Sequence, residues 1–220
     1  MSSGHLANLA IHVAGGIAGI LLGFFILARD KGTSLHRRLG RWFAYATLVV
    51  TGSAFSGVIL FRFLPLFTVL AVLVLYQLVG GWRAATTRER GPQLRDAGWT
   101  LLAGGACAAL APIVLARYVG PPVILYSSLG TLGVIICYDA LRFLFPRHWF
   151  ARVWRYEHGY KMISSLFAML SAFAGNVIRV GQPWSQLLPS IAGLLVIGYF
   201  FARFYREDSR SRAAALARFQ

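Results

Sequence analysis

Seven long apolar stretches alternate with short arginine-rich segments along the 220 residues of this chain. A helix rises about 1.5 Å per residue, so each stretch is long enough to cross a hydrocarbon core about 30 Å thick. The pattern predicts an all-α, polytopic integral membrane bundle of seven transmembrane helices, at residues 8–28, 40–61, 65–82, 97–118, 122–145, 155–178 and 187–205.

The positive charges divide unequally between the two sides of such a bundle. The first, third and fifth connections, the C-terminal tail and the start of the sixth helix hold 19 of the 22 Lys and Arg residues, which leaves Arg62, Arg117 and Arg179 for the other side. Cytoplasmic loops are enriched in Lys and Arg, so this bias predicts an outer N-terminus and a cytoplasmic C-terminus. We expect one transmembrane domain over 1–205 and a basic cytoplasmic tail, 206–220, that forms an interfacial helix.

The composition excludes a soluble domain. Hydrophobic residues make up 57% of the chain and charged residues 13%, whereas soluble domains carry about 25% charged residues. The net charge of +15 is spread over several short segments and lacks the clustered basic face of a nucleic-acid binder. We expect a multi-pass protein of a bacterial inner membrane whose partners are the lipid bilayer, other membrane proteins or a second copy of itself.

Small residues mark the packing faces of the expected helices. Gly15, Gly19 and Gly23 form a G-x-x-x-G-x-x-x-G run in the first stretch, which lets helix backbones approach closely in a membrane. A compact bundle is the interpretation that we favour. The alternative is a flat cofactor lying against the glycine face.

Three histidines are candidate ligands for a cofactor. His12 shares one helix face with glycines, as haem-binding histidines do, but no histidine of another stretch lies at its depth, so we favour a histidine that hydrogen-bonds a neighbouring helix. His36 and His158 both fall at the cytoplasmic rim, where they are placed to ligate a haem or a metal jointly. Neither an H-x-x-x-H nor a C-x-x-C spacing supports a dedicated metal site, and we predict none.

Polar residues inside apolar helices are expensive in lipid and therefore indicate function or pairing. Asp139, Gln77 and Asn176 are the residues of this kind. Asp139 lies one turn from Arg142, and the sequence favours a pair with Arg142 at the interface and a functional role of Asp139 about equally. Glu157 and Lys161 are spaced i, i+4, and the sequence favours a pair between them.

Two short motifs resemble those of a known family. The segment 31–41 reads K-G-T-x-x-H-R-R-x-G-R, which resembles a stretch between the first two helices in a family of bacterial predicted membrane proteins of unknown function. His12 matches a histidine in the first helix of that family, and 156–165, Y-x-H-x-x-x-M-x-x-S, is similar to its late His/Met/Ser pattern. The resemblance implies a polytopic inner-membrane protein without an assigned activity, and it adds weight to His12, His36 and His158 as candidate residues. A looser similarity to b561-type membrane cytochromes implies haem, although this chain lacks their two histidine pairs at matching depth.

Several functional classes are excluded by missing motifs. The chain has no P-loop, no G-x-S-x-G elbow, no H-E-x-x-H helix and no lysine in its seventh stretch for a retinal Schiff base, so no catalytic residue is assigned. Three hypotheses stay open: a haem- or quinone-linked redox protein, a small-solute transporter or channel, and a non-catalytic accessory subunit of a larger membrane complex.

Overall fold

The computed structural model describes residues 2–178 and 180–217. Within these residues seven α-helices and two short 3-10 helices follow one another: α1 (Ser3–Leu27), α2 (Ser34–Leu60), α3 (Pro65–Thr87), η1 (Arg88–Arg90), α4 (Leu94–Arg117), α5 (Pro122–Leu141), η2 (Arg142–Leu144), α6 (Arg147–Val177) and α7 (Trp184–Ala217). All of them except α6 and the two 3-10 helices are, by length and composition, apolar enough to cross a membrane, which gives six candidate spans in the described residues. The fold is thus a helical bundle compatible with a membrane protein.

The helix α6 departs from the sequence prediction in two ways. It begins at Arg147, eight residues before the predicted start at Arg155. It also carries Lys161, three serines and Asn176, which keep it out of the set of candidate spans. Lys161 and Ser165 are both fully buried, so these polar groups of α6 face the protein interior.

Local signals explain where the other helices start. Thr33 caps α2, with its side-chain oxygen accepting a hydrogen bond from the His36 backbone N–H at 3.1 Å. Pro65 and Pro122 occupy the first positions of α3 and α5, where the missing N–H of proline costs nothing. Both starts agree with the predicted stretches.

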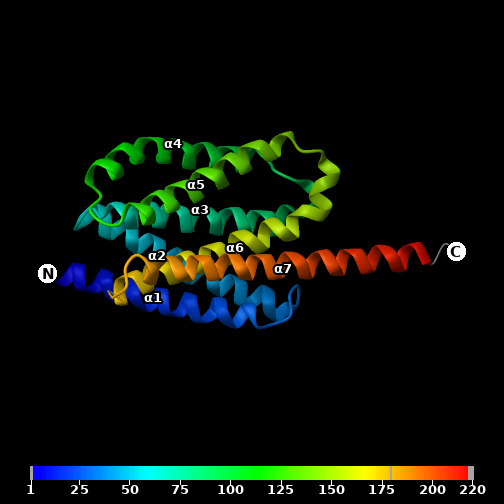
Figure 1. The fold of residues 1–220 in the computed structure, drawn as a ribbon, viewed down its shortest axis with the longest axis horizontal. Helices are drawn as coiled ribbons and strands as arrows, with labels where there is room; N and C mark the ends of the chain where they lie inside the picture. Colours follow the sequence, from blue (N-terminus) through cyan, green and yellow to red (C-terminus); the bar gives the residue numbers. More distant parts are fainter. Residues whose placement is uncertain (1, 179, 218–220) are drawn as a thin grey trace.

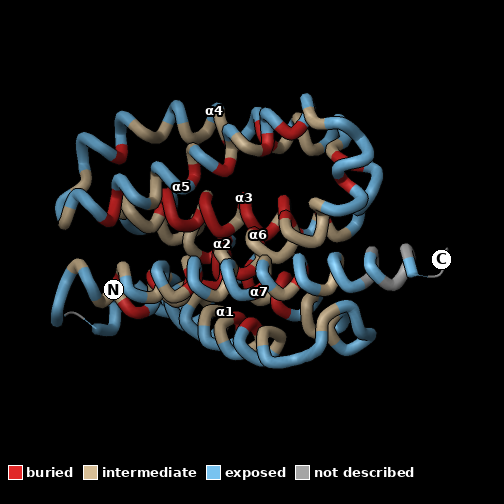
Figure 2. Tube along the Cα trace, turned by 45° about the vertical axis from the view of Figure 1, so that its right-hand side comes forward, coloured by how far each residue is buried: buried red, intermediate tan, exposed pale blue. Residues whose placement is uncertain are grey.

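The helices α3 and α6 form the centre of the bundle (Figure 1). They pack against each other, with α4 and α5 on one side and α1, α2 and α7 on the other. Figure 2 shows the buried positions concentrated on the central helices and exposed positions on the outer ones. Large apolar side chains on the outer helices are exposed, such as Leu101 at 76% and Leu194 at 68%. Such a surface is suited to contact with lipid.

Glycines allow the other helices to approach α6 closely. A Cβ atom on Gly23 of α1 would lie 2.5 Å from Leu166 Cδ1, and one on Gly81 of α3 would lie 2.8 Å from Met162 Sδ. A Cβ on Gly15 would lie 3.1 Å from Val49 Cγ1, and one on Gly19 would lie 3.5 Å from Met169 Cε. The glycine run of α1 therefore packs against α2 and α6.

The helix α7 continues without a break through residue 206, where we expected the tail to begin, and ends at Ala217. Figure 1 shows its C-terminal end extending beyond the other helices. Arg155 of α6 ties this extension to the bundle, because it pairs with Glu207 at 2.7 Å and with Asp208 at 3.0 Å.

Candidate functional site

A cavity of about 940 Å³, which we call the histidine pocket, lies where α1 and α3 end and where α2 and α6 begin. Phe43, Leu166 and Phe200 form part of its apolar wall. Six cationic side chains also line it, against a single acid, Glu89, among the lining residues: Lys31, Arg37, Arg41, Arg88, Arg90 and Arg155. Its volume lies within the range of about 300–1,000 Å³ that is typical of small-molecule and cofactor sites.

His36 and His158 face each other in this pocket. Their ring centroids are 6.3 Å apart and the ring planes cross at 86°. His158 Nδ1 lies 2.9 Å from the Gly81 backbone oxygen, which fixes the tautomer with the proton on Nδ1 and leaves the lone pair on Nε2. His36 Nδ1 is buried and has no hydrogen-bond partner in the described part of the chain.

The Lys31 side chain caps the C-terminus of α1 beside the pocket. Its ammonium donates hydrogen bonds to the backbone oxygens of Ile26, Leu27 and Arg29 at 2.6, 2.9 and 2.8 Å, and it lies 4.8 Å from the centre of the Phe200 ring. Cations at a helix C-terminus stabilise the unpaired carbonyl groups there. Partial burial, followed by the nearby charge of Arg203, lowers the pKa of Lys31 to about 8.

His12 lies apart from the other two histidines. Its Nδ1 is 3.0 Å from Ser53 Oγ and 3.1 Å from the Val50 backbone oxygen. Asn8 adds a hydrogen bond to the Ser53 backbone oxygen at 3.1 Å. His12 therefore joins α1 to α2, and the structure brings together only His36 and His158 of the three sequence candidates.

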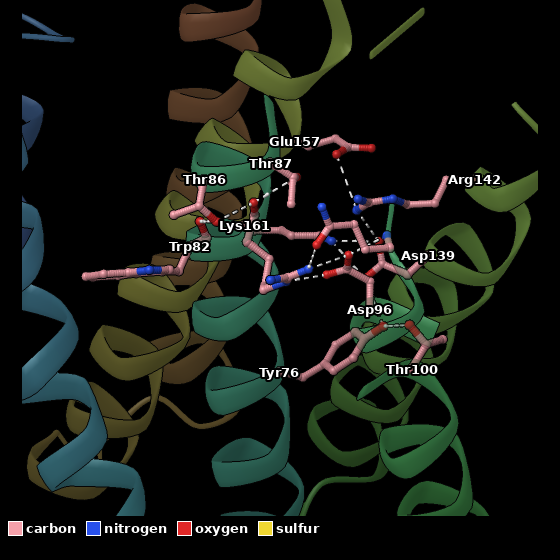
Figure 3. A network of polar contacts seen from close by, with 12 residues as sticks. Tyr76, Trp82, Thr86, Thr87, Asp96, Thr100, Asp139, Arg142, Glu157 and Lys161 are labelled. Atoms are coloured by element: carbon pink, nitrogen blue, oxygen red, sulfur yellow. Dashed lines mark hydrogen bonds and ion pairs between the residues drawn. The ribbon is translucent and has the colours of Figure 1, made fainter. Parts of the chain in front are cut away.

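A second polar feature, the ion cluster, lies between α3, α4, α5 and α6 (Figure 3). Lys161 Nζ contacts both carboxylate oxygens of Asp139, at 2.6 and 2.7 Å. Arg142 Nη1 lies 3.3 Å from Asp139 Oδ1 and 3.3 Å from Glu157 Oε2. All four side chains belong to residues that are at most 5% exposed. Two acids and two bases give the cluster a balanced charge.

The pairing within the ion cluster corrects the sequence prediction. Glu157 pairs with Arg142 and accepts a hydrogen bond from Tyr138 OH at 2.7 Å, so the expected Glu157–Lys161 pair is wrong. Lys161 pairs with Asp139 of α5 instead. The i, i+4 rule concerns exposed helix faces, whereas here the neighbouring helix offers a closer acid.

Tyr76, Thr100 and Asp96 were not among the candidate residues that the sequence indicated. Tyr76 OH donates to Asp139 Oδ2 at 2.8 Å and lies 3.2 Å from Thr100 Oγ1. Asp96 accepts two hydrogen bonds from Arg83, at 2.7 and 2.9 Å. The one sequence signal was the spacing from Gln93 to Asp96, which is that of a capping box.

The other two intramembrane polar candidates lie in different surroundings. Gln77 is fully buried and donates to Ser164 Oγ of α6 at 2.9 Å. Asn176 is exposed and donates to the Ala172 backbone oxygen at 2.8 Å, one turn back in its own helix. Gln77 therefore links the two central helices, whereas the Asn176 hydrogen bond stays within α6.

Within the described residues, no three His, Cys, Asp or Glu side chains gather as a protein-bound metal ion requires. Comparison of the chain with protein-family models, with curated proteins and with solved structures finds no match. The class of protein is therefore defined by the fold alone, a helical bundle with several membrane-compatible helices.

Proposed function

We propose that this protein is a haem-binding redox membrane protein in which His36 and His158 would hold the haem iron. A metal–nitrogen bond is about 2.0–2.1 Å and a ring nitrogen lies about 1.2 Å from its centroid, so imidazoles on opposite sides of one ion have centroids about 6.4 Å apart. A tetrahedral ion would bring the centroids to about 5.2 Å. The separation of 6.3 Å supports the first arrangement and is the observation that carries the proposal.

The hydrogen bonding of the two rings supports the same assignment. Ligating histidines donate their second ring N–H to a carbonyl or carboxylate, which orients the ring and increases its basicity, and Gly81 provides that carbonyl for His158. His36 has a buried ring nitrogen without a partner, and iron would supply a partner for this ring.

The pocket lining favours haem over a quinone. Haem combines an apolar macrocycle with two carboxylates, and the pocket combines an apolar wall with six cations. A quinone head group is neutral and would leave that positive charge without a counterpart. Arg41 and Arg90 line the pocket and form no ion pair within the described residues, so both are free to bind carboxylates. The bound haem would supply one-electron chemistry.

An absorption spectrum of the detergent-purified protein tests the proposal. We expect a Soret band and a positive pyridine haemochrome assay, and we expect His36→Ala and His158→Ala each to abolish the low-spin spectrum. His12→Ala is the matched control, because His12 is a histidine outside the pocket, and it should retain the band. A purified protein that shows no band after haem is added would overturn the proposal.

We further propose seven membrane spans with an outer N-terminus, in the inner membrane of a bacterium and in the family that the 31–41 segment resembles. Burial of Lys161, Ser165 and Ser171 inside the bundle supports counting α6 as the seventh span, since these groups avoid lipid. Cysteine-accessibility labelling at residues 62 and 206 tests the topology, because these positions should label from opposite sides.

The ion cluster favours a second candidate, a small-solute transporter. Charged residues within membrane helices often line transport pathways, and Asp139 and Lys161 are buried among α3, α5 and α6. Solute flux into proteoliposomes should then fall in Asp139→Asn. Flux that is unchanged in this variant, or absent from the wild type, would exclude the candidate.

A further inference from the structure

A small cavity of about 10 Å³ lies inside the ion cluster. Its lining includes Asp96, Trp99, Thr100, Asp139, Arg142 and Lys161. Figure 3 shows Trp82, which lines the histidine pocket, pointing to the opposite side of α3, so the two cavities are separate. A cavity of about 10–15 Å³, measured in this way, holds one water molecule.

The cavity is lined by hydrogen-bond donors without a protein partner. Trp99 Nε1 and Arg142 Nε are both buried and unpaired within the described residues. Arg142 is only 4% exposed. Lys161 directs two bonds to Asp139, which leaves the third N–H of its ammonium without an acceptor in the described residues. A buried donor without a partner costs about 1–3 kcal/mol, so an acceptor is required here.

Two acceptors with spare capacity also line the cavity. An ionised carboxylate accepts about four hydrogen bonds, and Asp139 already accepts four, from Lys161, Arg142 and Tyr76. Asp96 accepts three, from Arg83 and the Gln93 backbone, and therefore has one site left. The single Tyr76 proton goes to Asp139, so the Thr100 hydroxyl donates to Tyr76 and its oxygen is free to accept.

We infer that this cavity is a binding site for one ordered water molecule. The water accepts from Trp99 Nε1 and Arg142 Nε and donates to Asp96 and Thr100, which satisfies every group described above except the third Lys161 N–H. A cation would face unpaired N–H donors, and an anion would face the Asp96 carboxylate. A neutral molecule with two donors and two acceptors is the ligand that fits.

The water gives the ion cluster a hydrogen-bonded route to the solvent. The Asp96 and Arg83 side chains are 12% and 23% exposed, whereas the Lys161 side chain is fully buried. The water joins these two groups of charges, so that the partly exposed Arg83–Asp96 pair connects to the buried Asp139–Lys161 pair through Thr100 and Tyr76. This inference does not depend on whether the histidine pocket binds haem.

Nuclear magnetic resonance of detergent-solubilised protein, with ¹⁵N in its Trp side chains, tests the inference. The chain has six Trp residues, and Trp99→Phe assigns the indole signal of Trp99. We expect the Trp99 indole proton to show a dipolar contact with a water resonance of long residence time. The absence of that contact, while exposed Trp149 still reports water, would overturn the inference.

Two glycine variants test whether the water that contacts Trp99 lies in this cavity. Gly80 also lines the cavity, and a Cβ on it would lie 3.0 Å from Lys161 Nζ, whereas a Cβ on Gly105 would meet nothing within 4 Å. Gly80→Ala should therefore abolish the contact, and Gly105→Ala should leave it intact. If Gly80→Ala does not fold, Thr100→Val removes an acceptor at nearly constant volume and should weaken the contact. A contact that neither variant changes, or a Trp99 signal that shifts when sulfate replaces chloride, would overturn the inference.

Discussion

The histidine pocket and the ion cluster are both polar regions in an apolar bundle, but they are organised differently. The pocket encloses about 940 Å³ and is lined by six cations and one acid, and it leaves His36 Nδ1 without a partner in the described part of the chain. The ion cluster encloses about 10 Å³, and its two acids are paired with two bases. Unpaired cations around a large volume indicate a ligand, whereas ion-paired charges around a volume for one water molecule indicate a structural or relay role.

Removing one member of the ion cluster should have the largest effect on stability. Lys161→Met leaves the buried Asp139 carboxylate without its closest partner, and breaking a buried pair in this way costs about 3–5 kcal/mol. We expect this loss in the free energy of unfolding, measured by denaturant titration in mixed micelles. The haem band of the folded fraction should persist.

A double variant is the control for this experiment. Lys161→Met with Asp139→Leu removes both charges and leaves Arg142 paired with Glu157. It should be more stable than either single variant, because no buried charge is left unpaired. Strictly additive losses of stability would show that Asp139 and Lys161 do not interact. Loss of the haem band from folded Lys161→Met would show that the ion cluster and the histidine pocket are not independent.

A methyl group at Gly81 should disturb both regions through the contact between α3 and α6. Gly81→Ala would place a Cβ 2.8 Å from Met162 Sδ and 3.1 Å from Lys161 Cβ. Overpacking of this kind costs about 1–3 kcal/mol, and it also displaces the carbonyl that orients His158. Gly105→Ala, with open space around it, is the control that should unfold like the wild type in the same titration.

Neutralising one pocket arginine should have a smaller effect that is confined to ligand affinity. Arg41→Gln and Arg90→Gln each remove an exposed cation, and an exposed ion pair contributes about 0.2–1 kcal/mol, which corresponds to a weakening of haem binding by up to about fivefold. Haem titration followed by absorbance measures the change, which should shrink at high salt. Arg62→Gln, on the opposite side of the bundle, should leave the affinity unchanged.

The smallest effect concerns the charge of Lys31. Its pKa of about 8 lies below the ordinary value of 10.5, so the ammonium loses its proton as the pH rises through about 8 in the folded protein. The unfolded chain keeps that proton until higher pH, so the contribution of Lys31 to stability increases between about pH 8 and 10.5.

Acylation of the Lys31 amine at a series of pH values, followed by peptide mass spectrometry, should show a midpoint near 8. Arg203→Gln should raise this midpoint, because the charge of Arg203 is one cause of the lowered pKa. A midpoint near 10.5 in the wild type would show that the Lys31 ammonium is fully solvated.

The helices were predictable because their signals are local. The starts of α3 and α5 follow from Pro65 and Pro122, and each long apolar run is sufficient to predict its helix. The start of α6 was not predictable from hydropathy, because its first turns are rich in arginine. His36 and His158 were predicted to share the cytoplasmic rim, but no pattern in the sequence specifies the distance between them.

The sequence by itself determined the helical class, the asymmetric distribution of arginine and the candidate histidines, since each depends on residues close together in the chain. Only the tertiary structure decided which groups meet. Gly81 lets α6 approach α3, which orients His158 toward the pocket and places Lys161 beside Asp139 of α5. Pairings between helices depend on how closely their backbones approach and on helix rotation, and both are set by packing across the whole bundle.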